Sequence, residues 1–497
     1  MQIIFITPEA LPFSRAGGLG DVSFYLPRAL AHKGHEVIVV APKHRGSDKM
    51  KLVEIPQWKT EIDLSLSRHQ ASFFHGDTGD IHQAVLVGCD ELFDRSGLYG
   101  NEFGDYDDNA ERFIFFARGA LLAAANIARP DGRVVVHCHD WASGLVPMYL
   151  NNWNESLPSL RRAASVFTYH NLASQGIFLN YDFAMTGLDW SLFNHNGLEF
   201  YGRMNLTKAG LVGADIITTV SQKYAQESLT PSFGMGLEGV LMSREKDIIA
   251  VQNGVDYHQW DPGTDNYITA NYDLNDFSGK EECRLNLASL CGFADVGRPI
   301  VAMICRLLPR KGVDILIKAL DRMMELPINV AVMGLGEIHY QDFLLDASLR
   351  YPGRLSYKRA NDLVLIHHIL SGSDLFIMPS RFEPCGLEQL YALRYGAVPV
   401  VRATGGLDDT VIDSVAYPEE GTGYKFADYT PEAFLEALSR AVNDFGRKEL
   451  WTGIVRRGMN QNFSWDMAAA AYEDVYEKAL AKAAEKSPKE EDERFEF

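Results

Sequence analysis

The stretch QIIFITPEALPFSRAGGLGDVSFYLPRALAH, residues 2–32, decides the fold. It begins with a short apolar run at residues 3–7, passes through a glycine-rich loop, and ends in a helical pattern over residues 22–32 with Asp21 as the expected N-cap. A second apolar run at residues 37–41 is typical of a strand that is buried on both faces. A strand, a helix and a strand in this order predict one unit of a parallel α/β sheet.

The same alternation continues along the chain in two series, which predicts an α/β protein with two doubly wound, Rossmann-like domains that face a cleft. Further strands are expected at residues 134–136, 166–169, 216–220, 300–305, 329–333, 375–378 and 398–401, and further helices at 312–324, 387–395 and 466–483. We expect an N-terminal domain over residues 1–245, a C-terminal domain over 246–465, a final helix over 466–483 and a charged tail over 484–497.

The chain of 497 residues is acidic, with 66 Asp and Glu against 47 Lys and Arg and a net charge of -19. This charge disfavours general binding of nucleic acid or of an anionic membrane, so an anionic ligand requires a local basic pocket. No apolar run approaches the ~20 residues of a transmembrane helix, and no signal-peptide pattern precedes the first strand. The six cysteines form no Cys-x-x-Cys pair, so we expect reduced core thiols in a cytoplasmic protein.

Two loops of the first series carry candidate binding residues. In the loop Arg15-Ala16-Gly17-Gly18-Leu19-Gly20-Asp21, the glycines allow the backbone to approach an anion at a helix N-terminus. The spacing matches neither the dinucleotide fingerprint nor the P-loop, and a turn that only makes room for packing is the alternative. In His137-Cys138-His139-Asp140-Trp141, the two histidines lie on one side of a strand, but a third metal ligand at a recognisable spacing is missing. His139 is then either a structural histidine or a residue that points into the cleft.

Two cations of the second series are placed to bind a phosphate. Arg306 and Lys311 lie between the end of a strand and the start of a helix. A phosphate there would interact with both cations and with the helix dipole. The alternative is a solvated basic loop.

Two further loops of the second series also follow strands. In the first, SRFEPCGLEQL at residues 380–390, Glu383 is expected to face the cleft, and the N–H groups of Gly386 and Leu387 are expected at a helix start. The second loop is Thr404-Gly405-Gly406-Leu407. Because ligands of open α/β sheets bind beyond the carboxyl ends of the strands, all these loops are candidate parts of one site.

Taken together, these motifs resemble those of the bacterial-type glycogen synthases, which are closely related to the plant starch synthases. The matching motifs occur in the family order and cover residues 1 to about 480. They are the Gly17-Gly18 loop, His139-Asp140-Trp141, His170-Asn171-Leu172-Ala173 with Gln175-Gly176, Lys208-Ala209-Gly210, Asn253-Gly254-Val255-Asp256, Arg306 with Lys311-Gly312, Ser380 to Leu387, and Thr404-Gly405-Gly406-Leu407.

The resemblance implies a GT-B glycosyltransferase fold with the active site in the cleft between an acceptor-side N-terminal domain, the starch synthase catalytic domain, and a nucleotide-sugar-binding C-terminal domain. In this family the final helix returns to the N-terminal domain. The implied activity is retaining transfer of glucose from ADP-glucose to the non-reducing end of an α-1,4-glucan such as glycogen. The resemblance implies no metal and no other cofactor.

The resemblance also implies roles for individual residues. Arg306 and Lys311 match the residues that hold the diphosphate, and Gly18 matches the loop residue that approaches the distal phosphate. Glu383 matches the essential acid near the donor sugar, and His139 matches the histidine that contacts the glucose. The catalytic candidates are thus Glu383, His139, Arg306 and Lys311, and the donor-binding candidates are Arg15, Gly17, Gly18, Asp21, Arg306, Lys311, Gly386, Leu387, Gly405 and Gly406.

Elementary chemistry agrees with these roles. Negative charge grows on the diphosphate as it leaves, and Arg306, Lys311 and the loop N–H groups can stabilise it where other nucleotide-sugar enzymes use a divalent metal. We find no carboxylate pair like those of hydrolases that form a glycosyl-enzyme. We therefore expect front-face transfer, in which the leaving phosphate oxygen receives the acceptor proton and Glu383 orients the sugar.

Three departures from the family pattern leave alternatives open. Arg15-Ala16 stands where the family usually has Lys-Thr, Glu388 where Thr is common, and Asn361 where many members have Tyr. They allow UDP-glucose as donor, or a short oligosaccharide as acceptor. A catalytically impaired paralogue that binds glucan is a further alternative. A hydrolase or a phosphorylase is less favoured, because a phosphorylase requires a pyridoxal-binding lysine and a much longer chain.

Overall fold

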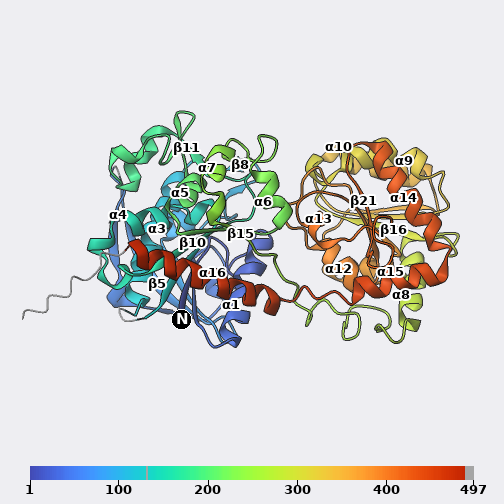
Figure 1. Cartoon of the computed structure of the whole chain (residues 1–497), viewed down its shortest axis with the longest axis horizontal. Helices are drawn as coiled ribbons and strands as arrows, with labels where there is room; N and C mark the ends of the chain where they lie inside the picture. Colours follow the sequence, from blue (N-terminus) through green and yellow to red (C-terminus); the bar gives the residue numbers. More distant parts are fainter. Residues whose placement is uncertain (66, 130–131, 487–497) are drawn as a thin grey trace, which may run out of the picture. The chain divides into compact units, whose positions relative to one another are not determined.

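The structure, a computed structural model, describes residues 1–65, 67–129 and 132–486, and the chain divides into two compact units. Unit 1 comprises Met1–Val220, Ala225–Gly254 and the segment from Trp465 onward, and unit 2 comprises Ser221–Tyr224 and Val255–Ser464. The division therefore falls between Gly254 and Val255, later in the chain than the expected boundary after residue 245. The final helix is part of unit 1 (Figure 1).

Unit 1 is built on one large sheet with the strand order β15-β14-β10-β9-β1-β2-β6-β5-β3, and β4 pairs with β5. Its strands are β1 (Gln2–Ile6), β2 (Glu36–Pro42), β3 (Leu52–Glu54), β4 (Thr60–Asp63), β5 (Arg68–Gly76), β6 (Gln83–Gly88), β9 (Val134–His139), β10 (Ala164–Tyr169), β14 (Ile216–Thr219) and β15 (Ile248–Ala250). In the part of this order from β15 to β6, each strand is parallel to its neighbours. At the other edge, β3, β4 and β6 pair antiparallel with β5. Smaller antiparallel sheets join β11 (Ile177–Phe178), β13 (Arg203–Asn205) and β12 (Glu199–Phe200), and β7 (Gly100–Asn101) with β8 (Gly104–Asp105).

The C-terminal helix completes the core of unit 1. The helix α16 (Trp465–Lys486) packs beside α1 (Gly18–His32) and against β10, and Figure 1 shows α16 as a red helix next to the blue α1. Its buried side chains Trp465, Tyr472 and Tyr476 join the apolar core formed with the parallel strands. The other helices of unit 1 are α2 (Asp90–Phe93), α3 (Asn109–Ile127), α4 (Leu145–Asn152), α5 (Leu206–Gly213) and α7 (Glu238–Ser243). The helix α6 (Gln222–Ser228) spans the division, since its residues up to Tyr224 are assigned to unit 2.

Unit 2 has a fully parallel sheet with the order β18-β17-β16-β19-β20-β21. Its strands are β16 (Ile300–Ile304), β17 (Asn329–Met333), β18 (Leu355–Lys358), β19 (Leu375–Met378), β20 (Val398–Arg402) and β21 (Tyr424–Phe426). Numbered along the chain, this order is 3-2-1-4-5-6, that of the doubly wound nucleotide-binding fold.

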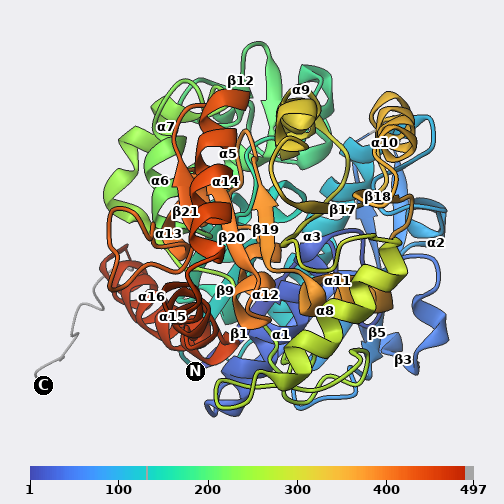
Figure 2. The ribbon, with the colours of Figure 1, turned by 90° about the vertical axis from the view of Figure 1, so that its right-hand side faces the viewer.

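Helices cover both faces of this sheet, with α9 and α14 packed together on one face and α8 and α11 on the other (Figure 2). The helices are α8 (Ser278–Cys291), α9 (Val313–Met323), α10 (Ile338–Arg350), α11 (Leu363–Gly372), α12 (Glu388–Arg394), α13 (Gly405–Thr410), α14 (Pro431–Phe445) and α15 (Lys448–Met459). Among the described residues, no helix combines the length and the apolar character that crossing a bilayer requires.

The structure confirms the predicted α/β class and its parallel strands, which are buried along almost their whole length because helices cover both faces. One local prediction is wrong. The first helix begins at Gly18, and its N-cap is Gly17 in an extended conformation, not Asp21. Asp21 instead lies in the first turn, where a carboxylate interacts favourably with the helix dipole.

Among the parallel strands of each unit, the direction in which successive strands are added to the sheet reverses once. The candidate site residues follow the strands on either side of that reversal. In unit 1 the order changes direction between β1 and β9, which precede the glycine loop and Asp140. In unit 2 it changes between β16 and β19, which precede Lys311 and Glu383. Connections leave in opposite directions at such a point, and the crevice between them is where open α/β sheets bind ligands.

Gly312 is required for the close approach of the two loops in unit 2. Its φ is +77°, and a Cβ at this position would lie 2.0 Å from the carbonyl oxygen of Pro379. We predict that Gly312→Ala destabilises the protein by about 2–4 kcal/mol, since backbone strain and a backbone clash act together. Urea unfolding measures the loss.

The matched control is Gly292→Ala. Gly292 also has a left-handed backbone, with φ +69°, but a Cβ added there would meet no heavy atom within 4 Å. This control carries the conformational cost alone, about 1 kcal/mol. Equal losses in the two variants would contradict the close approach at Gly312.

Candidate active site

Lys311 and Glu383 form a buried ion pair where the strand order of unit 2 reverses. Lys311 ends the short 3₁₀ helix Pro309–Lys311 after β16, and Glu383 lies in the loop after β19. The Lys311 Nζ donates to Glu383 Oε2 at 2.6 Å, and the Ser380 hydroxyl donates to the same oxygen at 3.3 Å. Lys311 is 9% exposed and Glu383 6% exposed. The structure thus brings together two of the predicted catalytic residues and adds Ser380. The sequence indicated Ser380 only through its position two residues after a buried strand.

The charge of Lys311 is balanced by two carboxylates. Burial opposes the charged amine, but Glu383 and Glu388 more than offset this effect, so the pKa of Lys311 is raised. Burial also opposes the charge of Glu388, yet Lys311 and the backbone N–H groups at its helix start hold the pKa of Glu388 below its usual value. Because Leu387 N donates to Glu388 Oε2 at 3.3 Å, the acid in place of the family's Thr is accommodated by its own helix start.

Arg306 differs from Lys311 in having no charge partner. It follows β16 by two residues and is exposed. Its side chain forms no ion pair or hydrogen bond with any residue in the described part of the chain. An uncompensated guanidinium beside a strand end is suited to bidentate binding of a phosphate.

The Gly405-Gly406 pair supports the loop that carries Glu383. Both glycines begin α13 and are buried. A Cβ at Gly406 would lie 1.8 Å from the carbonyl oxygen of Cys385, and Gly406 N donates to the carbonyl oxygen of Glu383 at 3.1 Å. The geometry therefore gives these glycines a positioning role, and direct contact of Gly386, Leu387, Gly405 and Gly406 with a donor stays a prediction.

In unit 1, a buried carboxylate organises the glycine loop. Glu9 Oε2 accepts hydrogen bonds from Ala16 N at 2.8 Å and from Gly17 N at 2.9 Å, and Glu9 Oε1 accepts from the Tyr99 hydroxyl at 3.0 Å. The N–H of Gly17 is thus occupied by Glu9. Gly18 is exposed and begins α1, whose first N–H groups have no intrahelical partner. Gly18 is accordingly better placed than Gly17 to present an N–H to an anion.

Arg15 and Asp21 form an ion pair across this loop. Their side chains approach to 2.7 Å, and that of Arg15 is 55% exposed. Burial raises the pKa of Asp21 to about 6, with Arg15 acting against this shift and Glu9 adding to it. The positive charge expected at position 15 is therefore partly neutralised inside the loop.

His137 and His139 occupy neighbouring inward positions of β9, and both are buried. Nδ1 of His137 is hydrogen-bonded to the Tyr476 hydroxyl at 2.9 Å, and its Nε2 to the Thr168 hydroxyl at 2.7 Å, so its role is structural. The ring of His139 stacks on Phe5 with 3.9 Å between centroids and is 0% exposed. Burial, together with the neighbouring histidines, lowers the pKa of His139 well below its usual value, so its ring is neutral.

His170, which follows β10, is the partly exposed member of a histidine pair. Its Nε2 lies 3.0 Å from Nδ1 of His139. Its backbone N–H donates to Asp140 Oδ1 at 2.8 Å. Asp140 has a φ of +54°, and burial raises the pKa of its carboxyl to about 7. His170 and Asp140 belong to motifs recognised in the sequence, but only the folded chain distinguishes the accessible His170 from the covered His139.

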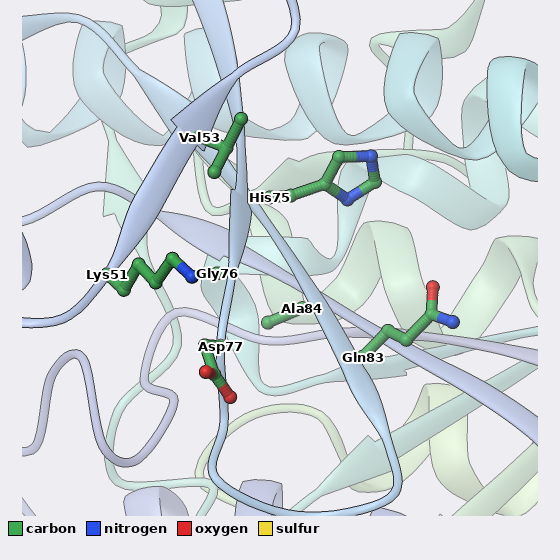
Figure 3. A pocket seen from close by; sticks show the side chains of 7 residues that line it. All are labelled: Lys51, Val53, His75, Gly76, Asp77, Gln83 and Ala84. Carbon is green, nitrogen blue, oxygen red and sulfur yellow. The ribbon is translucent and has the colours of Figure 1, made fainter.

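A separate hollow lies on the antiparallel edge of unit 1 (Figure 3). Seven residues line it, namely Lys51, Val53, His75, Gly76, Asp77, Gln83 and Ala84. None of them is among the predicted site residues. Figure 3 shows the Lys51, Asp77, His75 and Gln83 side chains spread apart rather than directed at a common point, so this hollow contains no concentrated set of polar groups.

Family models match both halves of the chain. Residues 2–243 match the starch synthase catalytic domain, and residues 293–452 match the glycosyl transferases group 1. Apart from Ser221–Tyr224, the first match lies in unit 1, and the second lies in unit 2.

Curated relatives match over nearly the full length. A glycogen synthase of Koribacter versatilis is 40% identical over 479 residues, covering 96% of this chain and 98% of the relative. Glycogen synthase 2 of Geobacter sulfurreducens is 41% identical over 482 residues, covering 96% and 99%.

Solved structures agree with these matches. The catalytic domain of Starch Synthase IV from Arabidopsis thaliana, bound to ADP and acarbose, superposes with a TM-score of 0.85 at 31% identity, covering 97% of this chain and 99% of that one. Sucrose-phosphate synthase from Thermosynechococcus elongatus, at 18% identity and a TM-score of 0.60, shares the fold. With relatives 40% identical over 96% of its length, the chain belongs to the glycogen and starch synthase family of glucosyltransferases.

Proposed function

We propose that this glucosyltransferase of glycogen synthesis takes glucose from ADP-glucose and adds it, with retention, to the non-reducing end of an α-1,4-glucan. The observation that carries the proposal is the buried Lys311–Glu383 pair in unit 2, together with Arg306, which lies in the same connection after β16 as Lys311 and has no ion-pair partner among the described residues. A nucleotide-sugar donor and a glucan acceptor are supported by the related starch synthase structure, which is bound to ADP and acarbose.

Arg306 and Lys311 would hold the diphosphate. Within the described residues, the side chain of Arg306 is free for bidentate contact, and the Lys311 amine has one hydrogen bond, to Glu383, so two of its three N–H donors can bind phosphate oxygens. Both cations would stabilise the charge that develops on the leaving diphosphate, and Lys311 is held in place before the reaction by its hydrogen bond to Glu383.

Glu383 would orient and stabilise the donor sugar. Its two hydrogen bonds, from Lys311 and from Ser380, both fall on Oε2. Oε1 is left without a partner in the described part of the chain, and it can accept a hydrogen bond from a sugar hydroxyl. A carboxylate paired this closely with an ammonium is a weak nucleophile, which favours front-face transfer over a covalent glucosyl-enzyme.

In unit 1, we assign the sugar contact to His170 rather than to His139. A residue that touches the glucose needs an exposed polar atom, and His139 is 0% exposed. His139 would instead orient His170 through their 3.0 Å contact. The N–H groups at the start of α1, from Gly18 onward, would approach the distal phosphate.

The identity of the donor nucleotide is tested by ADP and UDP release from glycogen-containing assays without added Mg²⁺. We predict that ADP-glucose supports turnover at least tenfold better than UDP-glucose, since the charges of the two departures are compensated, that of Arg15 by Asp21 and that of Glu388 by Lys311. A preference for UDP-glucose would overturn the donor assignment. Glycogen binding without release from either donor would favour the impaired paralogue.

Arg306→Ala tests the diphosphate role most cleanly, because the side chain is exposed and unpaired and its loss leaves no buried charge behind. We predict a fall of about 10²–10³-fold in kcat/KM for ADP-glucose with an unchanged Tm. Lys318→Ala, which removes an exposed cation from α9, is the matched control and should leave kcat/KM within twofold. Similar kinetics for the two variants would contradict the assignment.

Glu383→Gln preserves shape and should lower kcat by at least ~10³-fold while glycogen binding persists. The variant removes one of the two carboxylates that balance the buried Lys311, so it should also lose stability, by about 3 kcal/mol. The double variant Lys311→Met with Glu383→Gln removes the pair but leaves Glu388 without its lysine, so we expect it to recover only part of the stability and none of the activity. Activity in either variant, or a glucosyl adduct trapped on Glu383 of the unmodified protein, would refute the proposed role.

A further inference from the structure

A second cluster of chemically active side chains lies in unit 1, at the antiparallel edge of the large sheet. It consists of His69 on β5, Cys89 directly after β6, and Glu91 in α2. Each residue offers one ligating atom, and these atoms all lie within 4.8 Å of one another. None of the three residues belongs to the site described above.

The pairing of β5 with β6 brings these residues together. The two strands run antiparallel with Ser72 opposite Gly88. Further along the same ladder, His69 faces the segment that follows β6, which contains Cys89 and Glu91. The register of β5 and β6 therefore determines that these residues lie close together.

A fourth residue orients the histidine. His69 Nε2 is hydrogen-bonded to Glu111 Oε1 at 2.8 Å, and the Ser67 hydroxyl donates to the same carboxylate oxygen. The other ring nitrogen, Nδ1, lies 2.9 Å from Glu91 Oε2. A carboxylate on the outer nitrogen of a histidine is the usual second partner of a metal-binding imidazole, since it fixes the tautomer and raises the basicity of the ligating nitrogen.

The three residues of the cluster differ in how far they are exposed to solvent. His69 is 8% exposed and Cys89 9% exposed, whereas the Glu91 side chain is 75% exposed. Two ligands are thus held by the fold, the third can move, and the open side can admit water. Three protein ligands with a water in the fourth position form a recognised tetrahedral zinc arrangement.

We propose that His69 Nδ1, Cys89 Sγ and a Glu91 carboxylate oxygen bind Zn²⁺, with water as the fourth ligand and Glu111 positioning His69. Ligand atoms around tetrahedral zinc lie about 3.5 Å apart, so a turn of the exposed Glu91 and a small rotation of Cys89 close the site. Binding forms a Zn–S bond and releases the thiol proton of Cys89 to water. It also releases the proton of His69 Nδ1 where that nitrogen carried one. The thiolate and imidazole ligands select Zn²⁺ over Mg²⁺ and Ca²⁺.

A competing interpretation uses the same histidine without a metal. His69 between Glu91 and Glu111 would then be a buried imidazolium with two carboxylate partners. That interpretation involves His69, Glu91 and Glu111, but it gives the Cys89 thiol no part. The cysteine therefore distinguishes the two.

The test is metal binding by the full-length protein after dialysis against a chelator. Titration with Co²⁺ should give one equivalent per chain, with the thiolate-to-cobalt charge-transfer absorption and the intense visible bands of a tetrahedral site, and Zn²⁺ should displace both. Cys89→Ser should abolish the charge-transfer absorption and weaken Zn²⁺ binding at least 100-fold in competition with a chromophoric chelator. Glu111→Gln should weaken binding by about 10–100-fold while retaining the charge-transfer absorption.

Cys291→Ser is the matched control, because Cys291 is a partly exposed thiol of unit 2 that lies outside the cluster. It should bind Zn²⁺ and Co²⁺ like the unaltered protein, and thermal unfolding of each variant verifies that it is folded. Absence of stoichiometric binding would overturn the proposal. Equal binding by Cys89→Ser would also overturn it, since the ion would then lie elsewhere. Glucosyl transfer is not the readout, so the outcome is independent of the proposed donor.

Discussion

The reversal of strand order in a parallel sheet is the constraint on which the rest of this molecule depends. All strands of such a sheet end at one edge, and only at the reversal do the connections diverge and leave room for a ligand. Each unit has one such point, after β1 and β9 in unit 1 and after β16 and β19 in unit 2. Residues far apart in the sequence, such as Lys311 and Glu383, are brought within hydrogen-bond distance because their strands are neighbours there.

Charge at the site of unit 2 is organised around one buried lysine. Lys311 lies among carboxylates in a low-dielectric environment, where neither partner could remain charged alone without a large desolvation cost. Its charge is therefore largely balanced inside the protein, whereas the exposed Arg306 has no ion-pair partner among the described residues. This division explains how a chain with a net charge of -19 can attract a diphosphate: the attraction is local, and the overall charge acts against non-specific anion binding.

The parts of the fold that were predicted from sequence are those in which a segment is so completely buried that nearly all of its residues must be apolar. Strands buried on both faces are continuous apolar runs, so β16, β17 and β19 could be located directly. The antiparallel strands β3, β4 and β5 were not predicted, because this edge of the sheet is partly exposed and mixes polar with apolar residues. Motifs identified the loops of the site, but not which groups remain free within them. Glu9 occupies the N–H of Gly17, and Phe5 covers His139, and both facts depend on contacts across the fold.

At the strand ends of unit 1, an unfavourable backbone conformation and buried polar side chains lower the stability of the protein. Costs of this kind are expected where residues serve a function. Asp140 adopts a left-handed backbone, which is costly for a residue other than glycine, and it lies beside a half-buried histidine and a fully buried one. Burial raises the pKa of the Asp140 carboxyl to about 7 and lowers that of His170 to about 4, so both groups are held far from their usual protonation behaviour. A well-packed apolar strand end would avoid all of these costs. Their concentration where the strand order reverses is what a site that must orient a polar substrate requires.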